Sequence, residues 1–481
     1  MNILENLNPK RVFYYFEQLT QIPRCSYDEQ NVSDYLKSIG KKLGLETIQD
    51  DLLNIIIRKP ATKGYEESEG VIIQGHMDMV CEKEDDSNHN FKTDPIELII
   101  DGDYIRANKT TLGADNGIAI AMGLAILEDN TLEHPMIELL VTSSEETEMD
   151  GALGLSDKVL KGRRLLNVDS EEEGILVTGS AGGELIEIRV PAEYDNISGY
   201  DEVSIEVRGL MGGHSGMEIH KPRANANKIL NNILKEIKAS LDIKLVAITG
   251  GTKDNAIPRQ SVANIGVSTE DLSKFNNIIE EMKKKVLDDS KTHEPNIEIV
   301  ITKGDSVSKV FKDTVLNTVI SLLDNIPTGV FTRLPENEEI VESSSNLAII
   351  KTEDGRIIIQ VSTRSSAENN LLKLREKIVA SVNEANCQYE ISGSYPHWEY
   401  NPESRLRDTA LKVYEDLFHI KMESTVIHAG LECGVLAKKY PLDIISFGPN
   451  MYDVHTPQEK LSISSTERTY QYLIELLKQL K

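Results

Sequence analysis

The hydrophobic pattern of residues 1–185 alternates between helical periodicity and short apolar runs that end in polar residues. Strands that alternate with helices favour an α/β fold, with a mainly parallel central sheet flanked by helices. A helix is also expected after Asn8-Pro9, because the apolar side chains that follow recur on one helical face. That face comprises Val12, Phe13, Phe16, Leu19 and Ile22, the other predicted helices are 28–43 and 115–129, and the predicted strands are 54–58, 71–74, 137–142 and 164–168.

The pattern changes between residues 186 and 396, where two stretches of about 100 residues show the same order of elements. Each runs strand, helix, strand, strand, helix, which indicates a duplicated α+β unit; two unrelated α+β stretches are the alternative. The first stretch comprises 203–208, 222–239, 243–249, 260–268 and 270–287, and the second comprises 297–302, 311–324, 345–351, 356–363 and 367–384.

The pattern of the first region returns after residue 400, with a helix at 404–418, a loop at 428–434, a strand at 443–447 and a last helix. A chain of 481 residues also exceeds what one hydrophobic core usually supports. We therefore expect one discontinuous domain interrupted by an inserted one. The discontinuous domain would be 1–185 and 398–481, and the insertion 186–397, with repeats at 186–292 and 293–397.

The charge balance limits the partners that the protein can have. Asp and Glu total 78 against 52 Lys and Arg, and the net charge of −26 disfavours nucleic acids and anionic membranes. The chain has no apolar run of the roughly 20 residues that span a bilayer, and no signal-peptide pattern at its start. Cys25, Cys81, Cys387 and Cys433 are scattered without CxxC spacing, which predicts reduced thiols in a cytoplasmic protein.

Polar side chains with metal-binding chemistry follow three of the predicted strands. His76 and Asp78 come after one strand, Glu145 and Glu146 after another, and Asp169 after a third. In sheets of this kind ligands gather beyond the carboxyl ends of the strands, so these side chains are expected to converge. Each alone would be an ordinary loop residue. Together they indicate a site in which His76 binds a metal and Asp78 fixes its ring orientation.

Two histidines and three carboxylates of this kind suit a pair of divalent metals bridged by one carboxylate. Asp115 precedes a strongly apolar helix, so it is either a helix N-cap or a bridge whose two oxygens bind separate cations. Adjacent buried carboxylates need cations to offset their repulsion, so Glu146 is expected to bind a metal while Glu145 acts as general base. A solvated acidic loop is the alternative. The candidate metal ligands are His76, Asp115, Glu146, Asp169 and His455.

These residues lie in motifs that resemble the co-catalytic zinc peptidases of the carnosinase and aminoacylase kind. Within that family they are most similar to the aminoacyl-histidine, or cytosolic non-specific, dipeptidases, over essentially the whole chain. The resemblance implies that Asp115 bridges the metals, that Asp78 and Glu145 are the catalytic pair, and that the Asp115–Asn116 peptide is cis. The motifs are GHMDMV (75–80), TLGADNGIA (111–119), SSEETEMDGA (143–152), NVDSEEEG (167–174), GGHSG (212–216), NAIPR (255–259), ESSSNLA (342–348), HAGLECG (428–434) and HTPQE (455–459).

The inserted region, by this resemblance a lid domain, contributes further candidates. His214 is either a turn histidine between flexible glycines or a donor to the tetrahedral oxyanion, from the same chain or from a partner subunit. Arg364 follows a predicted strand, and its planar guanidinium suits the C-terminal carboxylate of a dipeptide. Asn255 is a second lid candidate. Glu432, in the 428–434 loop, is a candidate for the substrate α-amino group.

The expected function is metal-dependent hydrolysis of dipeptides, Xaa-His and broader, including β-alanyl-histidine. Two divalent metals would activate the attacking water; zinc is favoured, and carboxylate and imidazole ligands also permit cobalt or manganese. The alternatives are an N-acyl amino acid deacylase with the same metals and a metal-dependent binding protein that has lost catalysis. The partner is a small peptide substrate, and a monomer and a homodimer are both compatible with the sequence.

Overall fold

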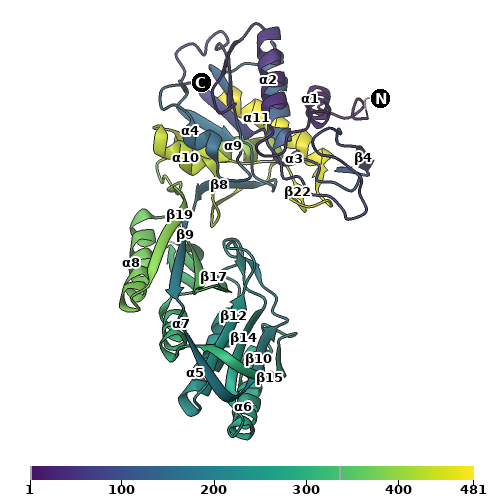
Figure 1. Cartoon of the computed structure of the whole chain (residues 1–481). Coiled ribbons are helices and arrows are strands. Elements are labelled where there is room, and N and C mark those ends of the chain that lie inside the picture. Colours follow the sequence, from purple (N-terminus) through teal and green to yellow (C-terminus); the bar gives the residue numbers. More distant parts are fainter. Residues whose placement is uncertain (1–2, 335–336) are drawn as a thin grey trace. The chain divides into compact units, whose positions relative to one another are not determined.

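The computed structural model describes residues 3–334 and 337–481, which divide into two compact units (Figure 1). Unit 1 extends to Ser180 and resumes at Trp398–Val426 and Leu431–Lys481. Unit 2 comprises Ala181–His397 and Ile427–Gly430. Residues 427–430 therefore group with unit 2, whereas the sequence pattern assigned them to the discontinuous domain. Each unit has its own large sheet and its own hydrophobic core.

Unit 1 is built on an eight-stranded sheet in the order β1-β2-β6-β3-β7-β21-β8-β20. The four central strands, β6, β3, β7 and β21, are parallel, and antiparallel strands flank them. Because β3 and β6 are buried on both faces, their sequences are mostly apolar rather than alternating, with Gln74 and Glu138 as buried polar exceptions. The strands are β1 (Glu46–Gln49), β2 (Ile55–Lys59), β3 (Val71–His76), β6 (Ile137–Thr142), β7 (Arg164–Asn167), β8 (Ile175–Ser180), β20 (Glu423–Ile427) and β21 (Asp443–Ser446).

The long helices of unit 1 lie where the hydrophobic periodicity predicts them. The most enclosed is α3, which packs against α1 and β3 and is buried on almost every side. Glycines allow this close approach: a Cβ at Gly75 would lie 2.2 Å from Asn116 Oδ1, and one at Gly123 would lie 2.3 Å from Leu139 Cδ1. The helices are α1 (Lys10–Thr20), α2 (Gln30–Lys42), α3 (Ala114–Glu128), α4 (Asp150–Gly154), α9 (Arg405–Phe418), α10 (Glu432–Lys439) and α11 (Ile463–Gln479).

A small antiparallel sheet in unit 1 carries the late histidine. Its order is β22-β23-β5-β4. The hairpin of β22 and β23 encloses residues 453–459, so His455 lies on a loop fixed at both ends by strand pairing. The strands are β4 (Leu98–Asp101), β5 (Tyr104–Ala107), β22 (Met451–Tyr452) and β23 (Lys460–Ser462).

Unit 2 is built on a nine-stranded sheet whose main path is β15-β10-β14-β12-β17-β18-β9-β19, with β16 paired to β17 beside it. A separate two-stranded sheet joins β11 and β13. The strands are β9 (Gly182–Pro191), β10 (Tyr194–Arg208), β11 (Gly213–His214), β12 (Lys244–Gly250), β13 (Ala256–Ile257), β14 (Ser261–Ser268), β15 (Glu298–Phe311), β16 (Gly329–Leu334), β17 (Asn337–Glu353), β18 (Arg356–Ser365) and β19 (Gln388–Tyr395), and the helices are α5 (Ala226–Ser240), α6 (Leu272–Ser290), α7 (Asp313–Asn325) and α8 (Glu368–Glu384).

The two halves of this sheet repeat one pairing order, with one half nested inside the other. In one half, β10, β12, β14 and β15 are the first to fourth strands and pair in the order 4-1-3-2. In the other, β9, β17, β18 and β19 show the same order. The predicted boundary near residue 292 differs from this arrangement, since β15 pairs with β10 rather than starting a second copy. The order of elements along the chain does not determine which strands are hydrogen-bonded to each other. An origin of unit 2 by duplication stays a prediction.

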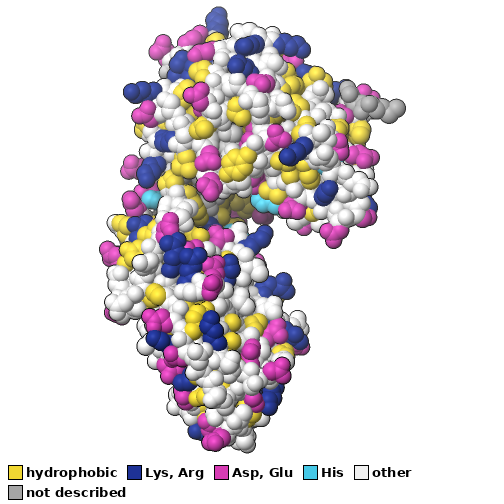
Figure 2. Space-filling view, viewed as in Figure 1, with side chains coloured by type: hydrophobic (Ala, Val, Ile, Leu, Met, Phe, Trp, Pro, Cys, Tyr) yellow, Lys and Arg dark blue, Asp and Glu magenta, His cyan; other side chains and the backbone are white. Residues whose placement is uncertain are grey.

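The predicted α/β fold class, with its parallel central strands and a second α+β region, is confirmed. Acidic and basic side chains are interspersed over the face of both units shown in Figure 2. Among the described residues, no helix combines the length and apolar character that crossing a membrane requires.

Candidate metal centre and lid cluster

The carboxylate of Asp115 lies between two histidines of unit 1. Its Oδ1 is 3.1 Å from His76 Nε2, and its Oδ2 is 3.1 Å from His455 Nε2. Asp115 is in the first turn of α3, His76 ends β3, and His455 lies on the loop between β22 and β23. Each oxygen thus faces a different histidine, as a carboxylate that bridges two cations would.

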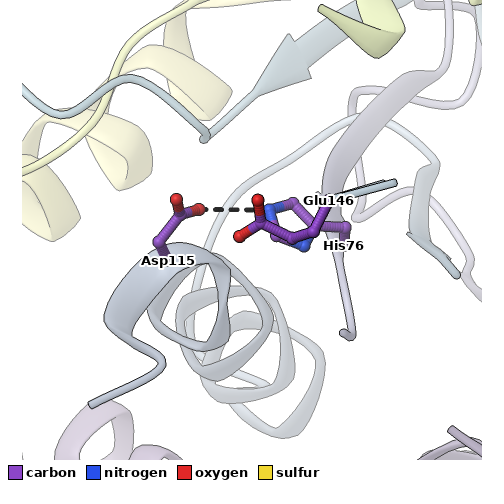
Figure 3. A group of neighbouring side chains, drawn as sticks. All are labelled: His76, Asp115 and Glu146. Atoms are coloured by element: carbon purple, nitrogen blue, oxygen red, sulfur yellow. Dashed lines mark hydrogen bonds and ion pairs between the residues drawn. The ribbon is translucent and has the colours of Figure 1, made fainter. Parts of the chain in front are cut away.

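Two further carboxylates flank this arrangement. Asp169 Oδ1 is 3.4 Å from His76 Nε2, and Glu146 Oε2 is 3.0 Å from His455 Nε2. One candidate ligand atom each from His76, Asp115 and Glu146 lies within 4.8 Å of the others (Figure 3). Asp169 Oδ1 and Glu146 Oε1 are buried without a hydrogen-bond partner among the described residues. Buried carboxylate oxygens without partners are costly, so this donor set fits divalent cations.

The electrostatics of the cluster reflect an excess of negative charge. Burial, together with the carboxylates of Asp115 and Glu146, raises the pKa of Asp169 to about 6. Burial and the same kind of repulsion, from Asp169 and Glu146, raise the pKa of Glu145 well above its usual range. Hydrogen bonds to Asp115 and Glu146 raise the pKa of His455 to about 11. Bound cations would therefore reduce the repulsion between these carboxylates.

Asp78 orients both the histidine and the acidic loop. Its carboxylate accepts hydrogen bonds from the backbone N–H groups of Glu145 at 3.0 Å and Glu146 at 3.1 Å, and from Ser26 Oγ at 2.8 Å. Its Oδ1 is 3.4 Å and its backbone oxygen 3.2 Å from His76 Nδ1. Burial disfavours the charged carboxylate, but His76 and these hydrogen bonds outweigh it and lower the pKa of Asp78.

Asn116 ties the start of α3 to the strand ends. Its Oδ1 accepts from the backbone N–H of His76 at 3.2 Å, and its Nδ2 donates to the Val168 carbonyl at 2.7 Å. The peptide bond between Asp115 and Asn116 is cis, as the family resemblance implied. One side-chain amide thus joins the backbone at the end of β3 and in the loop after β7 to the first turn of α3.

A disulfide bond joins Cys25 to Cys81, so the prediction of four reduced thiols is wrong for this pair. Cys387 and Cys433 are free. The paired cysteines are 56 residues apart in the sequence, and no spacing motif marks them. They meet because residue 25 forms a parallel bridge with Met79, in the segment that follows β3. The segment around Cys25 also contributes Ser26 to the carboxylate of Asp78.

Glu432 is fully buried at the start of α10. Its Oε2 accepts hydrogen bonds from Gln74 Nε2 and Thr142 Oγ1, both at 2.6 Å. Its Oε1 has no partner in the described part of the chain. Burial raises its pKa to about 8. The predicted contact between Glu432 and a substrate amino group stays a prediction.

In unit 2, the backbone fixes the tautomer of His214. Its Nδ1 accepts hydrogen bonds from the N–H groups of Gly216 at 3.2 Å and Met217 at 3.0 Å. Burial and the charge of Arg364 lower its pKa, which favours the neutral ring. A neutral imidazole whose Nδ1 accepts must carry its proton on Nε2. His214 therefore presents an Nε2–H donor.

A second histidine of unit 2, His428, lies near His214 and Arg364 and was not identified from the sequence. Its Nε2 is 2.7 Å from Ser344 Oγ, and Ser344 pairs in register with Arg364. Arg364 Nη1 donates to the Tyr395 hydroxyl at 2.7 Å. Burial and Arg364 lower the pKa of His428 to about 3. The HAGLECG motif contains His428 and was the one available signal. The cluster combines a cation with neutral rings, which suits an anionic ligand.

Asn255 lies beside this cluster, on an exposed turn. Its backbone oxygen accepts from the N–H of Ser215 at 2.8 Å, and β11 pairs with β13 so that His214 is opposite Ala256. Of the predicted substrate residues, the structure therefore places Asn255 and Arg364 in unit 2 with His214.

The sequence model of peptidase family M20/M25/M40 matches residues 72–479. The chain belongs to this family. The family resemblance inferred from the motifs is thereby confirmed. This chain is 34% identical to the cytosol non-specific dipeptidase of Escherichia coli over 488 aligned residues, which cover 100% of this chain and 99% of the relative.

Solved structures extend the comparison. The aminoacylhistidine dipeptidase of Vibrio alginolyticus matches with a TM-score of 0.90 at 34% identity, over 99% of this chain and 98% of that one. The aminopeptidase PepT of Bacillus cereus matches with a TM-score of 0.57 at 15% identity, over 98% of this chain and 99% of that one, and shares the fold.

Proposed function

We propose that this M20-family peptidase is a metal-dependent dipeptidase, whose metal centre is in unit 1 and whose carboxylate-binding groups are in unit 2. The observation that carries the proposal is the carboxylate of Asp115, each of whose oxygens faces a different histidine at 3.1 Å. The names of the full-length relatives support a dipeptide substrate, including Xaa-His peptides, and do not favour a deacylase or an inactive binding protein.

In this proposal, the centre would hold two divalent cations, and Asp115 would be a ligand to both. His76 and Asp169 would hold one cation, and His455 and Glu146 the other, since the two histidines face opposite oxygens of Asp115 and each further carboxylate lies beside one of them. Nitrogen and oxygen donors of this kind accept zinc, manganese and cobalt, with zinc the preferred candidate. When bound, the cations polarise the peptide carbonyl and lower the pKa of the attacking water.

Glu145 is the proposed general base. Its carboxyl is 3.9 Å from His76 Nε2, at the edge of the ligand cluster, and burial raises its pKa, which makes the carboxylate a stronger proton acceptor. Glu145 would take the proton of the attacking water and return it to the leaving amine. Asp78 would act by holding the backbone N–H of Glu145 and the ring of His76 in place.

The groups in unit 2 would contact the oxyanion and the C-terminal carboxylate of the substrate. The Nε2–H of His214 would donate to the developing oxyanion, a contribution of about 3–4 kcal/mol for a well-placed donor. Arg364 would pair with the free C-terminal carboxylate, and Asn255 is proposed as a further substrate contact. Glu432, one of whose oxygens has no partner among the described residues, is proposed to meet the substrate α-amino group.

The test is an assay of purified protein loaded with zinc, manganese or cobalt, over Xaa-His dipeptides, β-alanyl-histidine, an N-acetylated dipeptide and a tripeptide. Unblocked dipeptides should be cleaved best. Glu145→Gln should retain both metals while turnover falls by about 10²- to 10⁴-fold. Glu148→Gln, an exposed carboxylate on the same loop, is the matched control and should be unaffected. Substantial turnover by metal-loaded Glu145→Gln would rule out the general-base role.

The proposal extends to location and assembly. The name of the relative from Escherichia coli places that protein in the cytosol, and we propose the same compartment here. The disulfide between Cys25 and Cys81 is unusual for that compartment and provides an independent test of it. A monomer, in which His214 acts within its own chain, and a homodimer, in which a partner subunit supplies it, both fit the proposal, and sedimentation of the active protein distinguishes the two.

A further inference from the structure

The buried carboxylate of Glu459 is bound by four consecutive backbone N–H groups. Its Oε2 accepts from Leu112 at 2.7 Å and Gly113 at 3.0 Å. Its Oε1 accepts from Ala114 at 2.8 Å and Asp115 at 3.3 Å. Glu459 is 2% exposed, so these bonds do not compete with bulk water. Each oxygen therefore receives two donors, and the turn that presents Asp115 is held along its whole length.

Arg24 links the same turn to the segment after β3 through carbonyl groups. Its guanidinium donates to the carbonyls of Met77 at 2.9 Å and Asp78 at 3.1 Å, and also to that of Gly113. Arg24 is 1% exposed and ranks first by volume among the fully buried side chains. Gly113 has φ of 71°, and a Cβ there would lie 2.5 Å from Arg24 Nη2. Glycine at this position makes room for the guanidinium as well as for the turn.

The turn is not held by ordinary helical bonding. Leu112 and Gly113 precede α3, and Asp115 and Asn116 have non-helical backbone angles although they lie within its first turn. An acidic side chain at a helix start usually serves the N–H groups of the helix itself. Here the carboxylate also serves N–H groups before the helix. The direction of the Asp115 side chain therefore depends on Glu459.

Glu459 and His455 belong to the same short loop. Glu459 lies four residues after His455, and its own N–H donates to the Thr456 carbonyl at 3.1 Å. His455 Nε2 approaches Asp115 Oδ2 at 3.1 Å. One loop thus supplies a candidate ligand to one side of Asp115 and also holds the backbone of Asp115. A shift of this loop would move both together.

We infer that Glu459 is a positioning residue that, opposed by Arg24, aims the carboxylate of Asp115 so that its two oxygens serve two metals at once. This inference rests on the metal centre of the proposed function. It adds a role for the last residue of the HTPQE motif, which the mechanism otherwise leaves without one.

The test is Glu459→Gln, measured by metal titration and by the visible absorption of the cobalt-loaded protein. The amide nitrogen presents no acceptor to two of the four N–H groups, so the turn should relax. We expect metal affinity to fall by about 10- to 100-fold, as for other groups that orient ligands from outside the first coordination sphere. At saturating metal, kcat should fall while KM stays close to the wild-type value, and the cobalt spectrum should change.

Gln458→Ala is the matched control, because Gln458 is the exposed neighbour on the same loop, and it should behave as wild type. If Glu459→Gln does not fold, Glu459→Asp keeps the charge but is too short to reach all four N–H groups, and it should show an intermediate loss of affinity. Wild-type metal affinity and cobalt spectrum in either folded variant, with a lowered Tm alone, would overturn the inference. Wild-type protein that binds no metal would instead overturn the proposed function.

Discussion

His455 in unit 1 and His428 in unit 2 have pKa values shifted in opposite directions, because their surroundings carry opposite charge. His455 is 49% exposed in its side chain, yet hydrogen bonds to Asp115 and Glu146 raise its pKa to about 11. His428 is buried, and burial together with Arg364 lowers its pKa to about 3. The cluster in unit 1 has too many negative charges, and the cluster in unit 2 has a cation beside neutral rings.

The comparison indicates what each cluster is built to receive. Five carboxyl groups, those of Asp78, Asp115, Glu145, Glu146 and Asp169, surround His76 in unit 1, and cations would offset their repulsion. The cluster in unit 2 offers N–H donors and a guanidinium, which suit a carboxylate. The negative charge of the cluster in unit 1 therefore favours bound cations, and the positive charge of the cluster in unit 2 favours a bound carboxylate. The variants below alter one cluster at a time.

The largest effect is expected from Asp115→Asn. An amide cannot serve two cations with two anionic oxygens, so both metals should be bound poorly. Loss of the several kcal/mol that metals contribute corresponds to a fall in turnover of about a thousandfold. Elemental analysis and a dipeptide assay measure the two effects. Asp86→Asn removes an exposed carboxylate and should change neither. Full metal content in Asp115→Asn would refute the shared-ligand role.

The next effect concerns the disulfide, which lies in unit 1 alone. Loss of the Cys25–Cys81 bond in a Cys25→Ser, Cys81→Ser double variant should lower the free energy of unfolding by about 2–4 kcal/mol. Urea denaturation measures this, and Cys387→Ser in unit 2 is the control. Thiol counting in denaturant should give two thiols before reduction and four after. Four thiols in protein purified without reductant would contradict the disulfide.

A smaller effect is expected from Arg364→Met in unit 2. Hydrogen bonds to a charged group contribute about 1.5–3 kcal/mol, so KM for dipeptides should rise by roughly 10- to 150-fold while metal content stays unchanged. Arg364→Lys should restore part of the loss, since lysine keeps the charge but not the planar fork. A C-terminally amidated dipeptide should be a poor substrate for every form. An unchanged KM in Arg364→Met would exclude the carboxylate contact.

At neutral pH the smallest effect is expected from His428, which gives unit 2 a pH dependence of stability that grows only as the solution becomes acidic. His428 has a folded-state pKa of about 3, below its unfolded value of about 6.5, so the unfolded chain binds the extra proton first. The free energy of unfolding should therefore fall as the pH drops from 6.5 towards 3, by at most about 1.4 kcal/mol per pH unit. His428→Asn should lose this part of the slope, and the exposed His293→Asn should keep it. Identical slopes in wild type and His428→Asn would show that His428 is not held neutral.

The sequence predicted those features of the site that depend on the local pattern of apolar and polar residues. Apolar runs ending in polar residues located β3, β6 and β7, and parallel strands necessarily bring the residues after them to one edge. The structure accordingly brings His76, Glu146 and Asp169 to Asp115. His455 was joined to them as the second histidine of a two-metal set and through the family resemblance, because no local pattern relates it to residues 76–169.

The remaining features depend on contacts between segments that are distant in the sequence and carry no common motif. Arg24 reads as an ordinary loop arginine, and its burial follows from carbonyls of three other residues that turn toward it. Glu459 reads as a polar residue after a proline. Cys25 and Cys81 lack a spacing motif. The strand partners of β9 and β15 could not be chosen from the order of elements, since a strand pattern specifies its faces but not its neighbour.

The nested sheet of unit 2 has a consequence for how such a chain can change. Ser180 and Trp398, the last and first residues of unit 1 on either side of the insertion, exchange backbone hydrogen bonds at 2.9 and 3.0 Å. Within unit 2, Tyr194 and Phe311, which begin β10 and end β15, are likewise paired. Each insertion enters and leaves through neighbouring residues, a geometry in which inserted domains are tolerated. A segment inserted in this way can be replaced or lost without changing the path of the strands that flank it.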